Sequence, residues 1–207
     1  MRVERTSNNY RKELKKKVLK VAMHEFFKKG IRAVKMDDIA SILSISKRTL
    51  YEMYPNKEEL LIEGICLYNE EKHNHMYECS TAPGSNVMDV LMEFYNMQLE
   101  SVNEITPLFF ADLQKYEKAK KFIDSNRQKQ EEKAERFFQK GVKQGYFREG
   151  IDYQIITVAG LTSMQAVLHN EKIVNKGLKN IYHNIVGLFM RGLCTMKGLE
   201  ILEERLK

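Results

Sequence analysis

The stretch "SISKRTLYEMYPNKEEL", Ser44 to Leu60, indicates how the N-terminal part of the chain folds. A helical run from Lys47 to Tyr54 follows a short polar turn, and Pro55 and Asn56 then interrupt it. Ser46 stands immediately before the run, in the position of a helix N-cap. The stretch therefore predicts a short helix between two turns, with a longer helix starting near Lys57.

A second short helix is predicted before this turn, in "MDDIASIL", residues 36–43. Asp37 and Asp38 lie in its first turn, where the helix dipole favours acidic side chains. The apolar residues of the two segments can pack on each other across the turn, with Ile45, Leu50 and Tyr54 opposite Ile39, Ala40 and Leu43. Two short helices that back each other in this way indicate a helix-turn-helix.

The outer face of the second helix then carries Lys47, Arg48, Thr49 and Tyr51. A recognition helix enters the major groove of DNA by its N-terminal end, so side chains of its first two turns reach the duplex. Lysine and arginine meet phosphates or guanine edges there, and the hydroxyl groups donate to phosphate oxygens. The alternative is a solvated basic helix in a helical bundle, with no nucleic-acid partner.

The distribution of charge favours a polyanionic partner for one end of the chain. Residues 1–64 hold 15 Lys/Arg and nine Asp/Glu, whereas residues 65–207 hold 19 of each, so the whole net charge of +6 lies in the first third. Residues 1–36 alone carry 12 basic and three acidic side chains. A basic N-terminal module on a neutral body is typical of a nucleic-acid-binding protein.

Residues 18–61 resemble the DNA-binding domain of the TetR/AcrR family of bacterial transcriptional regulators. The residues that carry the resemblance are Ala22, Phe26 or Phe27, Gly30, Asp38-Ile39-Ala40, Ile45-Ser46, Thr49-Leu50-Tyr51, Tyr54, Lys57-Glu58 and Leu60. The resemblance implies a homodimer that binds double-stranded operator DNA and responds to a small molecule. It also implies a set of DNA-contacting residues, namely Lys35, Met36, Ser46, Lys47, Arg48, Thr49, Tyr51 and Lys57.

The chain departs from the family pattern at several of these positions. Lys35 replaces the usual threonine or serine at the start of the second helix, which removes an N-cap that Asp38 can replace by binding free amides. Ser44 replaces the glycine of the turn, so it must either tolerate an unfavourable backbone angle or shift the turn. Arg48 replaces a small residue, and Glu52 and Met53 stand where aromatic residues or histidine are frequent. The operator sequence therefore cannot be transferred from a relative.

Helical periodicity continues through the rest of the chain, and strand patterns are almost absent. We therefore predict an all-α fold of nine to ten helices, with a three-helix DNA-binding domain at residues 1–56 and an effector-binding and dimerisation domain at residues 57–207. After the linker Thr81–Asn86, the predicted helices cover about residues 87–103, 107–116, 117–144, 152–170 and 175–197, followed by a tail to Lys207.

The last two of these helices carry apolar stripes with small residues, which predict a four-helix dimer interface. The interface residues that we expect are Ala159, Ser163, Ile185, Phe189, Gly192 and Met196; Ile181 and Leu188 share the stripe. The alternative is that both stripes pack inside one subunit.

An effector pocket is predicted among the central helices, where flexible thioethers and aromatic rings suit an adaptable cavity. Its candidate residues are Met92, Tyr95, Phe109, Phe110, Phe137, Met164 and Gln165, although residues of this kind are more often ordinary core. The effector is expected to be small and hydrophobic, and no cofactor is expected.

Other classes of function find less support in the sequence. The segment "YRKELKKKVLK" could instead bind a membrane surface or a polyanion without sequence specificity. His75 and Cys79 share a helical face and could hold a metal with a third ligand from elsewhere, but we favour exposed polar residues near a helix end. No arrangement of side chains indicates catalysis. Cys66, Cys79 and Cys194 show no CxxC spacing, so we expect reduced thiols. No apolar segment is long enough to span a membrane, and we therefore expect a cytoplasmic protein.

Overall fold

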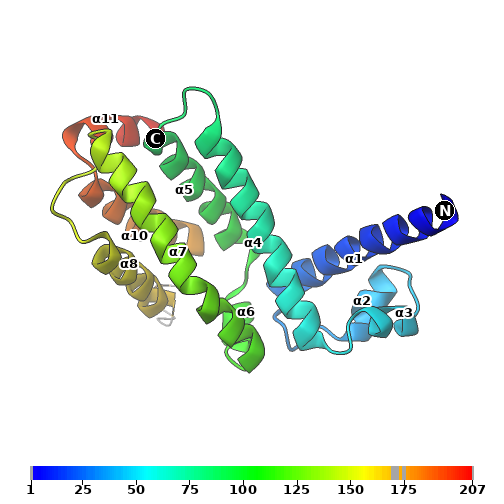
Figure 1. Cartoon of the computed structure of the whole chain (residues 1–207). Coiled ribbons are helices and arrows are strands. Elements are labelled where there is room, and N and C mark those ends of the chain that lie inside the picture. Colours follow the sequence, from blue (N-terminus) through cyan, green and yellow to red (C-terminus); the bar gives the residue numbers. More distant parts are fainter. Residues whose placement is uncertain (1, 169–172, 174–175, 207) are drawn as a thin grey trace. The chain divides into compact units, whose positions relative to one another are not determined.

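The chain is built of helices, as the labelled ribbon in Figure 1 shows. The computed structural model describes residues 2–168, 173 and 176–206. Over these residues it forms no strand and only one isolated bridge, between Phe147 and Cys194, which confirms the all-α prediction. The helices are α1 (Arg2–Lys29), α2 (Met36–Ile42), α3 (Lys47–Met53), α4 (Lys57–Thr81), α5 (Val87–Glu104), α6 (Pro107–Leu113), α7 (Glu117–Lys143), α8 (Tyr153–Leu168), α10 (Leu178–Leu193) and α11 (Met196–Arg205).

Helix α1 ends at Lys29, directly before Gly30. Gly30 has a φ of +81° and donates its amide to Phe26 O at 2.9 Å, so the chain leaves the helix in the left-handed conformation that glycine adopts without strain. Within the helix, Val18, Ala22 and Phe26 recur at a spacing of four residues, and all three are fully buried. This stripe is the α1 side of the core of the DNA-binding part.

The chain divides into two compact units, and the first consists of Met1–Lys72 and Ile105–Ser125. Its core joins α1, α2, α3 and the start of α4 with α6 and the first residues of α7. Phe27 of α1 packs edge-on against Tyr68 of α4 and Phe109 of α6, with ring centroids 5.0 and 4.9 Å apart. Segments from the second half of the chain thus complete the core that supports the helix-turn-helix.

The second unit consists of His73–Glu104 and Asn126–Lys207, and α5 packs there against α10 and α11. Its fully buried side chains include Val87 and Met88 of α5, Phe147, and Leu202 of α11. Because α4 runs from Lys57 to Thr81 and α7 from Glu117 to Lys143, each of these helices has residues in both units.

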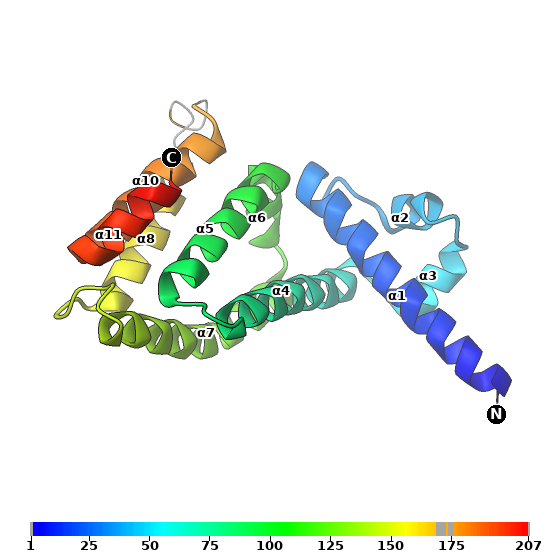
Figure 2. The same cartoon turned by 90° about the horizontal axis from the view of Figure 1, so that it is seen from above.

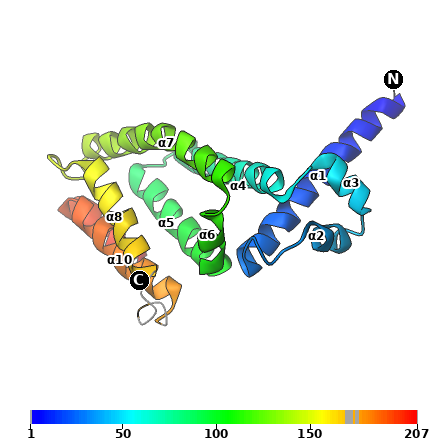
Figure 3. The same ribbon diagram turned by 90° about the horizontal axis from the view of Figure 1, so that it is seen from below.

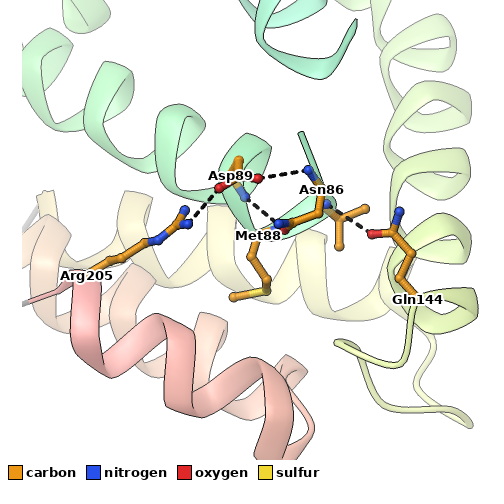
Figure 4. A network of polar contacts seen from close by, with 6 residues as sticks. Asn86, Met88, Asp89, Gln144 and Arg205 are labelled. Atoms are coloured by element: carbon orange, nitrogen blue, oxygen red, sulfur yellow. Dashed lines mark hydrogen bonds and ion pairs between the residues drawn. The ribbon is translucent and has the colours of Figure 1, made fainter. Parts of the chain in front are cut away.

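A network of polar contacts fixes the start of α5, as Figure 4 shows. The side-chain oxygen of Asn86 accepts the Met88 amide at 2.7 Å, and Asp89 Oδ2 accepts the Asn86 amide at 2.8 Å. Asp89 Oδ1 also lies 2.7 Å from Arg205 of α11, and Gln144 Oε1 accepts the Val87 amide at 3.1 Å. The free amides of α5 are therefore satisfied by side chains that also join it to α11 and to the end of α7.

The predicted final helix, residues 175–197, is wrong in one respect: the chain breaks at Cys194 and starts α11 at Met196. The break is stabilised by hydrogen bonds from distant residues, since Arg148 N donates to Leu193 O and Thr195 N donates to Tyr146 O, both at 2.9 Å. Thr195 then caps α11 by accepting the Gly198 amide. The segment expected to be a tail is thus mostly helical, whereas the predicted helix ends at residues 170 and 175 lie outside the described residues.

The predicted domain boundary after residue 56 separates a DNA-binding part from an effector-binding part. It stays a prediction, because the two compact units are defined by packing and not by function. No helix among the described residues is both long and apolar enough to cross a membrane.

Candidate nucleic-acid interface

Helices α2 and α3 pack on each other through the residues that the sequence indicates. Ile39, Ala40 and Leu50 are 0%, 2% and 0% exposed, and Tyr54 covers the end of α3 with only 2% of its surface exposed. With its inner face buried in this way, α3 can turn only its other face to a partner.

The turn between the two helices is a helix C-cap closed by two backbone hydrogen bonds. Ile45 N donates to Ala40 O at 3.0 Å, and Ser44 N donates to Ser41 O at 3.1 Å, which is the Schellman pattern. Ser44 occupies its left-handed position with a φ of +53°, where glycine is the usual residue. The unfavourable backbone angle expected at Ser44 is confirmed.

The starts of both helices are capped by side chains. Ser46 Oγ accepts the Thr49 amide at 3.0 Å and lies 2.7 Å from the Thr49 hydroxyl, so the predicted N-cap of α3 is confirmed. At α2, the Asp38 carboxylate accepts the Lys35 amide at 2.8 Å. This contact is the expected compensation for the threonine or serine that Lys35 replaces.

The outer face of α3 presents two cations, each held by an acidic neighbour. Lys47 Nζ lies 2.6 Å from Asp37 Oδ2, and this hydrogen bond raises the pKa of the ammonium. Arg48 Nε lies 2.8 Å from Glu52 Oε1, one turn further along the same helix, while 88% of the arginine side chain is exposed. Tyr51 is 47% exposed beside them. The surface is therefore basic and hydroxyl-bearing, and it carries carboxylates that orient its cations.

Lys57, predicted to contact DNA, is engaged within the protein. Its ammonium donates to Ile31 O at 2.9 Å and to Arg32 O at 3.4 Å, and partial burial lowers its pKa. The Arg32 amide donates to Asp112 Oδ2 of α6 at 2.8 Å. The turn after α1 is thus held by α4 on one side and by α6 on the other.

Met36 requires a correction among the predicted DNA contacts. Its side chain is only 6% exposed and belongs to the core of the first unit, because it opens the buried face of α2. Lys35, one residue earlier, is exposed and remains available.

The sequence did not indicate Asp37 and Glu52 as residues of this surface. Asp37 nevertheless positions the ammonium of Lys47, and Glu52 positions the guanidinium of Arg48. The spacing of four residues between Arg48 and Glu52 is a signal that could have revealed their pair. No local spacing indicates the pair of Lys47 and Asp37, because the turn brings two different helices together.

The residues of the predicted effector pocket do not form one cluster. Met92 and Tyr95 are buried in the core of the second unit, with Phe137 and Met164 partly buried against it. Phe109 is instead buried in the first unit against Phe27, and Phe110 is 47% exposed. Both lie on α6, which packs against α1. Gln165 lies in α8, but its side chain is outside the described part.

The predicted dimer residues occupy different environments on α8, α10 and α11. Phe189 packs within the subunit, because a Cβ on Gly160 would lie 3.7 Å from its ring, and Ile181 is 6% exposed. Ala159, Ser163 and Ile185 are half-buried, and Gly192 and Met196 are exposed. Some residues of the predicted interface thus pack inside the subunit, and others are exposed on its surface.

His75, considered as a metal ligand, lies 2.5 Å from Glu93. Among the described residues, no three histidine, cysteine, aspartate or glutamate side chains are grouped so that they could hold a metal ion.

The first unit thus presents a helix-turn-helix with a basic outer face, the arrangement with which helix-turn-helix domains enter the major groove of DNA. Residues 18–63 match the family model described as bacterial regulatory proteins, tetR family, which confirms the resemblance seen in the sequence. No curated protein matches the chain by sequence.

Solved structures extend the likeness over most of the chain. The regulatory protein TetR from Rhodobacter sphaeroides has 14% identity, a TM-score of 0.68, and coverage of 86% of this chain and 97% of its own. A protein from Saccharomonospora viridis in complex with choline has 16% identity, a TM-score of 0.62, and coverage of 89% and 99%. The ketosteroid transcriptional regulator KstR2 of Mycobacterium tuberculosis has 18% identity, a TM-score of 0.53, and coverage of 87% and 95%. The chain thus has the TetR fold over nearly its whole length.

Proposed function

We propose that this chain is a repressor that binds a palindromic operator as a homodimer and releases it when a small hydrophobic effector binds the C-terminal part. The observation that carries the proposal is the two-sided α3. Leu50 is fully buried on one face, whereas Lys47, Arg48 and Tyr51 are exposed on the other, within the first two turns that enter a major groove.

Dimerisation is supported by an apolar outer surface on two helices that pack side by side, α8 and α10. Ile155 and Leu161 of α8 are 64% and 57% exposed, and Leu188 of α10 is 69% exposed. Large apolar side chains exposed on two packed helices favour a protein partner. A second copy of the chain fits, because a two-fold dimer presents two copies of α3 to two half-sites of a palindrome.

The effector response is supported by a polar pair within the second core. Tyr95 is 4% exposed, and its hydroxyl lies 2.6 Å from His183 Nδ1. The centroid of its ring lies 5.6 Å from that of Tyr182. Small-molecule sites combine apolar surroundings with a few polar groups that orient the ligand, and the pair of Tyr95 and His183 could supply such groups. The S. viridis protein of the same fold was solved with choline. In our proposal a ligand near Tyr95 displaces α4, which begins at Lys57 beside α3.

The test is a binding selection with the purified chain on randomised duplexes, followed by titration of the selected duplex, of a random duplex of equal length and of anionic lipid vesicles. We expect a palindrome that is preferred by about 10³-fold or more. Equal binding of random DNA and of anionic lipid vesicles would reject the proposal and favour a basic helical module without sequence specificity.

A further inference from the structure

Helix α1 extends well beyond the domain that it helps to form. The family match starts at residue 18, but the helix starts at Arg2, so about four turns precede the match. Figures 2 and 3 show that this N-terminal part of α1 projects past α3. Lys15 marks the crossing, because its ammonium lies 5.5 Å from the ring centroid of Tyr54, the C-cap residue of α3.

The projecting part of α1 is strongly basic. Residues 2–17 contain seven Lys/Arg and two Asp/Glu. Lys15 pairs with Glu63 at 2.6 Å, and Lys16 and Lys20 lie 3.7 and 2.9 Å from Glu71, so these three lysines attach α1 to α4. Arg11 and Lys12, one turn earlier, are exposed and have no ion pair among the described side chains.

Helical periodicity determines the side of α1 on which Arg11 and Lys12 lie. They precede Val18 and Leu19 by seven residues, so each pair of positions projects from nearly the same side of the helix. Val18 and Leu19 are 0% and 5% exposed and face the core that contains α2 and α3. Beyond the end of that core, the same side of α1 therefore carries cations in place of apolar side chains.

The length of the projection suits a duplex bound at α3. The 13 residues from Arg2 to Leu14 span about 20 Å at 1.5 Å per residue. The major groove is about 12 Å wide, so a helix of this length reaches past the groove to the phosphates that border it.

A membrane surface fits this segment less well than DNA does. An interfacial helix buries a continuous apolar face. Between residues 9 and 17, Tyr10 and Leu14 are the only large apolar side chains, and Leu14 already packs partly against the protein core.

We propose that the N-terminal part of α1, through Arg11 and Lys12, binds the sugar-phosphate backbone of DNA that flanks the site read by α3. The inference rests on the proposed function, because it places the duplex at α3. Contacts of this kind add affinity for every sequence and no base preference.

The test compares the double variant Arg11→Ala/Lys12→Ala with Lys140→Ala/Lys143→Ala, which removes the same charge from exposed positions at the end of α7. Each protein is titrated over a range of salt concentrations with the selected operator, with a random duplex of equal length, and with anionic lipid vesicles. We expect the α1 variant to lose about tenfold or more in affinity for both duplexes. The slope of log affinity against log salt should fall by about four, one for each cation lost in a dimer.

A shortened operator provides a second readout. When the duplex is trimmed to the two half-sites, the wild type and the α1 variant should bind with nearly equal affinity, because the flanking phosphates are gone. The inference is overturned if the α1 variant and the α7 control bind both full-length duplexes alike, or if only vesicle binding is lost. Failure of the proposed regulator function would give a different result, namely a wild-type protein that binds all DNA sequences equally.

Discussion

The ammonium of Lys57, the first residue of α4, donates a hydrogen bond of 2.9 Å to the carbonyl oxygen of Ile31, in the turn after α1. The contact joins two segments that are 26 residues apart, and the ammonium also reaches Arg32 O at 3.4 Å. An ammonium has three donors, so one remains for a phosphate of bound DNA. The position of α4 relative to the helix-turn-helix therefore depends on this side chain.

We predict that Lys57→Ala has two separate effects. The free energy of unfolding should fall by about 1 kcal/mol, since a charged donor to half-buried carbonyls is lost at a partly solvated site. The salt slope of DNA binding should fall by about two units per dimer, one for each subunit. Urea unfolding and titration at several salt concentrations measure the two effects.

Lys57→Gln is the control, because it keeps a hydrogen-bond donor and removes the charge. It should recover part of the stability but none of the salt slope. If Lys57→Ala leaves the salt slope unchanged, Lys57 does not contact DNA and only stabilises the turn after α1.

Replacing Ser44 with glycine should stabilise the protein. Ser44 has a φ of +53° in the turn between α2 and α3, and a side chain in this region costs about 1–2 kcal/mol. Glycine relieves this strain but gains freedom in the unfolded chain, so a net gain of about 0.5–1 kcal/mol is expected, or roughly 1–4 °C in Tm. Thermal unfolding followed by circular dichroism measures it. Ser44→Ala keeps the Cβ, and a gain as large as that of glycine would contradict the explanation.

The local features of the helix-turn-helix could be predicted because they depend on neighbours in sequence. The cap at Ser46 and the conformation of Ser44 each involve residues only a few positions away. The contacts of Lys57 with Ile31 and of Lys47 with Asp37 could not, since both depend on how the helices fold back on each other.

The end of α10 illustrates the same limit. Apolar periodicity continues from Ile181 to Met196, so the sequence favours one helix. The break at Cys194 is fixed by two backbone hydrogen bonds with residues almost 50 positions earlier: Arg148 N donates to Leu193 O, and Tyr146 O accepts from Thr195 N. For the same reason, periodicity identifies an apolar stripe but cannot tell that Ile181 lies inside the subunit while Leu188 is exposed.

The contribution of Asp89 to stability should depend on pH. The amide of Asn86 and then the guanidinium of Arg205 hold the pKa of the Asp89 carboxyl below its usual range. A group whose pKa is lowered on folding stabilises the protein above its unfolded pKa, near 4, and loses that contribution as the pH falls through the folded value. Asp89→Asn should therefore lower Tm at pH 7, and the difference from wild type should shrink below about pH 4.

Thermal melts of both proteins from pH 7 to pH 3 provide the measurement. Asp124→Asn, at an exposed position of α7, is the matched control and should show little difference at any pH. A deficit of Asp89→Asn that stays constant down to pH 3 would contradict the charged role of this carboxylate.

The dimer should separate when a charge is placed on the outer face of α10. A Cβ on Gly192 would meet nothing within 4 Å in its own subunit, so a side chain can leave the helix at this exposed position without a clash at its Cβ. We expect the wild type to be a dimer at micromolar concentration and the variant to be a monomer, as measured by light scattering. Gln139→Arg adds the same charge on α7 and should remain dimeric. A monomeric wild type, or a dimeric Gly192→Arg, would show that this surface is not the interface.

Arg48 is the residue of α3 for which we expect a direct role in base recognition. Its side chain is 88% exposed, and Glu52 holds Nε at 2.8 Å, which leaves the two terminal nitrogens of the guanidinium directed outward. A guanidinium fits guanine O6 and N7 in a bidentate contact that discriminates by about 1–3 kcal/mol. Arg48→Ala should therefore relax the preference at one symmetric base-pair position and leave nonspecific affinity largely intact. Lys47→Ala should do the reverse, because a flexible ammonium more often meets phosphate.

Glu52→Gln separates the orientation of Arg48 from its charge. The amide oxygen can still accept from Nε, so the variant should keep the base preference of the wild type, whereas Glu52→Ala frees the guanidinium and should weaken that preference without abolishing it. Nonspecific affinity should rise in both variants, since each removes a carboxylate that repels phosphate. Selections on randomised half-sites, run in parallel for the four variants and the wild type, measure all of these effects. If Arg48→Ala weakens every site equally and the base preference is unchanged, Arg48 contacts phosphate, and the face of α3 that reads the bases is rotated toward Tyr51.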